Sequence, residues 1–178
     1  MKLFMLSLGG KIFGANIEVH DVKFAVAEKI EDTYDLVRSN WYGIKEKLHM
    51  DAYTEIKGAD GYRIRLTIEK PVVSDSKESD SIEATEKLYF VYMGGYSIGK
   101  TQEQHDVGLY VASSPNEAKA KASKDTRRFE KEGHIDSVVE VESCLLAANG
   151  DKYYIAFEKT DESFEIKPEW LGYKRLDI

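Results

Sequence analysis

The sequence predicts an α+β protein built from two tandem ββαββ repeats, with an antiparallel sheet and pseudo-twofold symmetry. Three observations support this prediction. The chain of 178 residues repeats itself at a constant offset, which carries Lys2 onto Lys87 and His20 onto His105. Each half contains two pairs of strand-like segments on either side of one helical pattern. Short turns join the consecutive strands, which favours antiparallel pairing with the helix covering one side of the sheet.

The halves match best where polar residues cluster. Residues 2–10 align with 87–95 without a gap, Glu18-Val-His20-Asp21 aligns with Glu103-Gln-His105-Asp106, and His49-Met-Asp51 aligns with His134-Ile-Asp136. All four histidines of the chain therefore fall in two repeat-matched positions, each with acidic neighbours. A half of this size is marginal alone, because small domains bury a smaller fraction of their surface. We therefore expect the halves to pack on each other.

The first half begins with an apolar run. Residues 2–8 predict a buried strand that stops at Gly9-Gly10, and residues 11–17 predict a loop. The same apolar run recurs at residues 87–93, in mid-chain, which argues against a signal peptide at the start. Alternation resumes from His20 through Val26, which predicts a second strand with the histidine at the rim of the core.

A helical pattern follows in residues 28–43, where Ile30, Tyr34, Val37 and Trp41 recur at helical spacing. Trp41 is expected to pack in the core. Residues 49–56 and 62–68 then predict two strands joined as a hairpin through residues 57–61.

The second half repeats this order. Ser114-Pro115-Asn116-Glu117 has the sequence of a helix start, with a capping serine, a proline in the first turn and a capping-box glutamate. The helix is expected to continue through Phe129 to Gly133. Residues 135–147 and 153–157 predict two strands with a turn at residues 149–151. The tail from residue 160 to 178 is expected to dock on the fold through Trp170 and Tyr173.

These patterns predict a domain organisation of three parts. Residues 1–70 form the first repeat, the acidic, serine-rich residues 71–86 form a linker, and residues 87–178 form the second repeat with its C-terminal tail.

Composition excludes several classes of function. The net charge is −7 without a basic face, which disfavours nucleic-acid binding, since that binding requires many phosphates to be neutralised. A content of 42% hydrophobic and 32% charged residues is typical of a soluble globular protein and not of a membrane protein. Cys144 is the single cysteine, so no internal disulfide can form and a reducing cytoplasm is the expected location. A small-molecule ligand, a protein partner or a homo-oligomer is compatible with this composition.

Specific motifs link the chain to a known family. They are residues 3–10, Gly14, Glu18-Val-His20-Asp21-Val22-Lys-Phe24, Trp41-Tyr-Gly43, His49-Met-Asp51 and Asp60-Gly61-Tyr62-Arg-Ile64. With these motifs the sequence resembles the bacterial domain-of-unknown-function 1543 family, whose members carry one or two copies of such a unit. The resemblance covers most of residues 2–66. The resemblance implies no activity, substrate or cofactor. The function must therefore be inferred from the chemistry of the individual residues.

The repeated polar residues are the candidate site. The ligand or metal candidates are Glu18, His20, Asp21, His49 and Asp51 in the first half, and Glu103, His105, Asp106, His134 and Asp136 in the second. Two imidazoles with one or two carboxylates suit a divalent metal such as zinc, manganese or iron. One obstacle is strand parity. His20 is in phase with its apolar neighbours, whereas His49 and Asp51 are out of phase with theirs, so the two segments could meet only near strand ends or across a twisted corner.

Three interpretations of this site remain open from the sequence. The first is a metal or small-ligand site in each half. The second is a structural or protein-interaction module whose His-Asp pairs only brace loops, because buried polar groups need partners. The third is metal-free general-base catalysis by a His-Asp pair, for which the repeat offers no matched nucleophile. The spacing of Gly9-Gly10 and Gly14 predicts a tight loop and not a phosphate cradle, because the lysine of a P-loop is missing.

Overall fold

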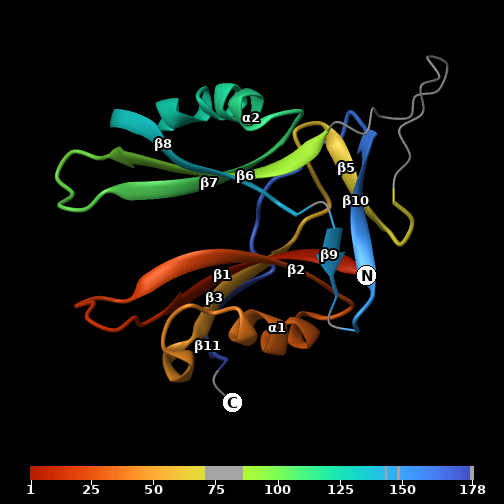
Figure 1. The fold of residues 1–178 in the computed structure, drawn as a ribbon. Helices are drawn as coiled ribbons and strands as arrows, with labels where there is room; N and C mark the ends of the chain where they lie inside the picture. The colour runs from red at the N-terminus through yellow and green to blue at the C-terminus, as the bar shows by residue number, and fades with distance from the viewer. Residues whose placement is uncertain (71–85, 143, 148, 177–178) are drawn as a thin grey trace.

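The computed structural model describes residues 1–70, 86–142, 144–147 and 149–176. The chain is α+β, with mostly antiparallel strands and two short helices (Figure 1). The predicted linker at residues 71–86 lies outside the described residues except for Glu86, and so does the side chain of Cys144. In the described part of the chain, no helix is both long and apolar enough to cross a membrane.

The first half forms a four-stranded sheet in the order β11-β3-β1-β2. Its strands are β1 (Lys2–Gly10), β2 (Val19–Ala27), β3 (His49–Glu55) and β11 (Trp170–Arg175). One face of this sheet is covered by the 3₁₀ turn η1 (Ile30–Thr33), the helix α1 (Tyr34–Ser39) and the turn η2 (Lys45–Lys47). Phe4, Leu6 and Leu8 of β1 pack there against Val37 and Trp41.

The second half forms a three-stranded sheet in the order β7-β6-β8. Its strands are β6 (Lys87–Tyr96), β7 (Gln104–Ala112) and β8 (Lys131–Glu140). The helix α2 (Pro115–Ala122) and the turn η3 (Asp125–Arg128) cover its outer face. The registers of the two sheets correspond, since Lys2 pairs with Ala27 in the first and Lys87 with Ala112 in the second.

A third sheet joins the two halves, in the order β4-β5-β10-β9. Its strands are β4 (Gly58–Ala59), β5 (Tyr62–Thr67), β9 (Cys144–Leu146) and β10 (Lys152–Lys159). The predicted hairpin between residues 49–56 and 62–68 is therefore wrong. β3 stays in the first sheet, and β5 leaves it to pair antiparallel with β10 of the other half. Local turn signals could not reveal this pairing, because the partner strand lies far away in the sequence.

The main core lies between the β11-β3-β1-β2 and β7-β6-β8 sheets, which face each other (Figure 1). It combines buried residues from both halves, such as Leu3 and Met5 with Leu88 and Val111. Phe24 contacts Phe90 across the interface, edge to face, with ring centroids 5.8 Å apart. The faces that meet here are the ones left bare by α1 and α2. The halves therefore do pack on each other, as the small size of each half predicts.

Both predicted helices are shorter than expected. The first ends at Ser39, and Trp41 lies beyond it, buried against Gly10 of β1, where a Cβ atom would meet the indole at 2.8 Å. The second begins as predicted, with the Ser114 hydroxyl accepting from the Glu117 amide, but it ends at Ala122. β8 then begins at Lys131, four residues before the predicted strand at 135, and ends at Glu140, so residues 135–147 are not one strand.

The predicted strand end at Gly9-Gly10 is confirmed, since β1 ends at Gly10, although both glycines belong to the strand, as Gly94 and Gly95 belong to β6. The glycines serve close packing and not a loop. The predicted docking of the tail takes the form of β11, which pairs with the outer edge of β3.

Candidate functional site

One glycine in the central strand of each sheet brings two histidines together. Gly9 pairs with His20 on one side and with His49 on the other. In the second half, Gly94 pairs in the same way with His105 and His134. Residues directly opposite each other on neighbouring strands place their side chains on the same face of the sheet. The four histidines therefore form two pairs, each across a glycine near the end of its central strand.

A β-bulge adds a carboxylate to each pair. In β3, Ala52 pairs with Ser7 and Met50 with Leu8, so Asp51 has no partner residue in β1. In β8, the pairing skips Asp136 in the same way. A bulge inserts one residue and changes the direction of its side chain. This removes the parity obstacle, because the extra residue puts His49 on the same face as Ala52, and His134 on the same face as Ser137.

In the first cluster, four side chains converge. Nε2 of His49 lies 3.3 Å from Oδ1 of Asp51 and 3.6 Å from Oε2 of Glu18. Nε2 of His20 lies 3.6 Å from the second oxygen of each of these carboxylates. Each carboxylate therefore bridges both imidazoles.

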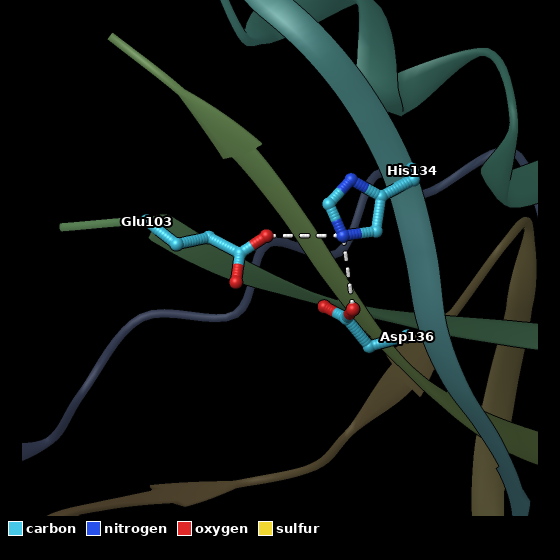
Figure 2. Close-up of side chains that lie close together, drawn as sticks. All are labelled: Glu103, His134 and Asp136. Atoms are coloured by element: carbon cyan, nitrogen blue, oxygen red, sulfur yellow. Dashed lines mark ion pairs between the residues drawn. The ribbon is translucent and has the colours of Figure 1, made fainter.

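In the second cluster, Nε2 of His134 lies 3.0 Å from Oε1 of Glu103 and 3.0 Å from Oδ1 of Asp136 (Figure 2). Nε2 of His105 lies 3.3 Å from the other Glu103 oxygen. Glu103, His134 and Asp136 can each offer one ligand atom, with all three atoms within 4.8 Å of one another. Oε1 of Glu103 is shielded from solvent, and it accepts no hydrogen bond among the described residues despite its distance to His134. This oxygen is near the imidazole nitrogen without the alignment of a hydrogen bond.

Backbone carbonyls set the tautomer of two of the histidines. Nδ1 of His49 lies 3.2 Å from the carbonyl oxygen of Lys47, and Nδ1 of His134 lies 2.7 Å from that of Glu132. A carbonyl oxygen can only accept, so Nδ1 carries the proton. In the neutral ring, Nε2 then presents a lone pair toward the carboxylate oxygens, which are also acceptors. Such an arrangement needs a cation, either a proton or a metal ion.

The glycines leave the room that these side chains fill. A Cβ atom at Gly94 would lie 2.7 Å from Oδ2 of Asp136, 2.7 Å from Oε1 of Glu103 and 3.0 Å from Nε2 of His134. A Cβ atom at Gly9 would overlap Nε2 of His49. Sequence reasoning missed this role. The sequence did contain a signal for this role. Gly9 recurs as Gly94 at the same offset at which His20 recurs as His105 and His49 as His134.

Aromatic rings flank the clusters differently in the two halves. Tyr173 of β11 stacks on His49, with ring centroids 4.2 Å apart, and His49 is only 2% exposed. In the second half, Tyr92 stacks on His105 at 4.8 Å, while the side chain of His134 remains 42% exposed. The C-terminal strand therefore covers His49 in the first cluster, whereas its counterpart His134 in the second cluster is more exposed.

The environment shifts the pKa of three groups. Burial raises the pKa of Asp51, although His49 and His20 oppose the shift. The backbone carbonyl of Glu132 raises the pKa of His134, and the carboxylates of Asp136 and Glu103 add to this. Burial next to Asp136 and Glu103 also raises the pKa of Tyr92. The raised pKa of Asp51 disfavours negative charge in the first cluster, and the raised pKa of His134 favours positive charge in the second.

Two of the candidate residues lie outside the clusters. The carboxylate of Asp21 pairs with Lys23 at 2.8 Å and accepts from the amide of Val22. Asp106 pairs with Arg128 and accepts from the amide of Val107. Their neighbours His20 and His105 project from the opposite face of the strand, so the aspartates cannot reach the cluster.

Comparison with known proteins gives a family without a function. The family model described as Domain of Unknown Function (DUF1543) matches residues 15–66 and 100–156, one segment in each half. The crystal structure of a protein Il1583 from Idiomarina loihiensis is similar to this chain, with 32% identity and a TM-score of 0.70. That similarity covers 98% of this chain and 97% of the other. No curated protein matches the chain.

Proposed function

The chain belongs to the DUF1543 family, whose description assigns no activity, and from the geometry of its clusters we propose that it binds a divalent metal ion in each half. The first site would use Glu18, His20, His49 and Asp51. The second would use Glu103, His105, His134 and Asp136. This proposal treats residues 1–70 and 87–178 as pseudo-twofold ββαββ repeats that each supply one site.

The spacing of the ligand atoms is the observation that carries the proposal. Two atoms bound at roughly 2.1 Å to one metal stand about 3.0–3.4 Å apart at tetrahedral or cis-octahedral angles. The imidazole-to-carboxylate distances in the second cluster are 3.0, 3.0 and 3.3 Å, and in the first they are 3.3–3.6 Å. Metal-bound histidines usually donate the other ring N–H to a backbone carbonyl or a carboxylate. His49 and His134 are held in that way.

The chemistry of the ligands narrows the choice of metal. Two nitrogen and two oxygen ligands without sulfur suit zinc, manganese or iron. Four protein ligands fill a tetrahedral zinc site, whereas an octahedral manganese or iron ion would keep two positions for water or another ligand. A dication would also neutralise the two carboxylates of its site.

A structural brace is the alternative, and one observation favours it. The raised pKa of His134 favours an imidazolium, which could pair with Glu103 and Asp136 without any metal. In that case the clusters would only hold the strand ends together. In a structural brace a proton on the imidazole lies between the ligand atoms, whereas in a metal site a metal ion lies there.

Metal analysis of the protein purified without a histidine tag separates these alternatives. After dialysis against zinc, manganese or iron(II), we expect about two equivalents per chain in the wild type and about one in Gly94→Ala. The alanine methyl group would displace the Glu103 and Asp136 oxygens without substituting any of the ligand residues. Gly9→Ala is the matched control, because it should remove the other equivalent.

The opposite result would contradict metal binding. A wild-type protein that holds no metal near one equivalent per half, and whose melting temperature does not shift with any of the three metals, rules the proposal out. His49→Ala gives a second measurement. If it lowers the stability equally with and without metal, the brace explains the clusters.

A further inference from the structure

One histidine of each cluster lines a cavity between the halves. This cavity has a volume of about 500 Å³ and lies between the facing sheets. Each half contributes one histidine to its lining, His20 from β2 and His105 from β7. A molecule bound there would contact one histidine of each candidate metal site.

Much of the cavity wall is apolar. Val22, Phe90, Val107 and Val139 line it, and Tyr92 adds a ring that stacks on His105. Small-molecule sites of roughly 300–1,000 Å³ typically combine such walls with a few polar groups that orient the ligand. The hydroxyls of Ser7 and Ser137 and the two histidines are the polar groups at hand.

The charged residues around the cavity determine whether an anion can bind there without a metal ion. Among the described residues, the lining includes no lysine or arginine, and its two aspartates, Asp21 and Asp106, already pair with Lys23 and Arg128. Without metal, the nearby carboxylates would repel an anion. With a dication in each cluster these carboxylates are neutralised, and an open coordination position becomes the strongest point of attraction for an oxygen anion.

We propose that this cavity binds a small carboxylic acid with an apolar or aromatic body, one carboxylate oxygen coordinating a metal beside His20 or His105. The inference rests on the proposed metal sites. The apolar body would lie between the sheets against Phe90 and Val139, and the carboxylate would replace metal-bound water. Binding of the acid is therefore metal-dependent.

2-Naphthoate tests this inference, because it is fluorescent and has both features. We expect it to bind the manganese-loaded protein, in which the metal keeps open positions, at least about tenfold more tightly than the metal-free protein. The uncharged 2-naphthamide, with the same ring system, should show no such dependence on metal. In the manganese-loaded protein, the naphthoate protons nearest the carboxylate should show the strongest paramagnetic broadening.

A pair of tryptophan substitutions locates the binding site. Val139→Trp fills the cavity without removing a metal ligand, and it should weaken naphthoate binding at least about tenfold at unchanged metal content. Leu146→Trp is the matched control, since Leu146 is exposed outside this cavity and its change should have no effect. If Val139→Trp does not fold, the broadening measurement on the wild type decides alone.

Two outcomes overturn the inference. If the protein loads metal normally but binds naphthoate no better than the metal-free form does, the cavity is not an acid site, and the metal sites stand. If naphthoate binding is unaffected by Val139→Trp, coordination within the cavity is excluded.

Discussion

At the level of single residues, the cluster in each half depends on a glycine in the central strand and on an aspartate in a β-bulge. Gly9 and Gly94 leave the space in which imidazoles and carboxylates meet. Asp51 and Asp136 are the extra residues of bulges, which put the histidine two residues before each of them on the inner face of its sheet. Neither feature contributes a large stabilising contact of its own. Their recurrence at matched positions in both halves is what suggests that the clusters bind something.

His134 should make metal binding at the second site depend on pH. Its pKa is raised by the Glu132 carbonyl, Asp136 and Glu103, so a metal must displace a proton that is held more tightly than in an ordinary histidine. Affinity should rise with pH and level off only above the ordinary histidine pKa of about 6.5. Titrations of the Gly9→Ala variant between about pH 5.5 and 8.5 measure this site alone. An affinity that is constant over this range would contradict the prediction.

In the metal-free protein, the free energy of unfolding should change with pH in the opposite direction to the metal affinity. Because the folded-state pKa of His134 is raised, its protonation stabilises the fold fully below the unfolded-state pKa, and this contribution is lost as the pH rises through the folded-state value. A metal ion would replace the proton in that upper range. The same titration series therefore needs unfolding measurements on the metal-free protein as its reference.

At the scale of elements, β11 accounts for the main difference between the sites. It pairs with the outer edge of β3, places Tyr173 on His49, and leads into Leu176, which is buried at 4% exposure. In the second sheet, the order β7-β6-β8 leaves β8 as an edge strand among the described residues. One cluster is therefore stabilised by an added strand, and the other is not.

A chain that stops after Lys167 should lose stability and weaken the first site. Removing β11 exposes the edge of β3 and the surface under Leu176 and Trp170, at a cost of roughly 2–5 kcal/mol. In the Gly94→Ala background, which reports only the first site, release of metal to a chelator should become faster. In the Gly9→Ala background the release rate should stay unchanged. Equal acceleration at both sites would mean that β11 acts through global stability only.

At the scale of the whole molecule, the halves are interlaced. β5 of the first half pairs with β10, and β11 returns from the C-terminal end to pair with β3. The main core also draws its buried residues from both halves. The halves therefore share strands as well as a core, and the cavity between the sheets exists only because they do.

Neither half should fold alone. Residues 1–70 would lack β10 and β11, and residues 87–178 would lack β5, so each would expose a sheet edge and half of the main core. We expect each fragment to show no cooperative thermal transition by circular dichroism, and the full chain to show one. A cooperative transition in residues 1–70 alone would indicate an autonomous domain.

The duplication, the α+β class and the first two strands of each half could be predicted from the amino-acid sequence, because they follow from local alternation and a constant repeat offset. The family was predicted from the resemblance of specific motifs. The sequence also pointed to the residues that lie in both clusters. Three features are visible only in the folded chain: β5 pairs with β10, β11 covers the edge of β3, and bulges put His49 and His134 on the same face as Ala52 and Ser137. These features depend on contacts between segments far apart in the chain, and no local pattern of side chains encodes which distant strand completes a sheet.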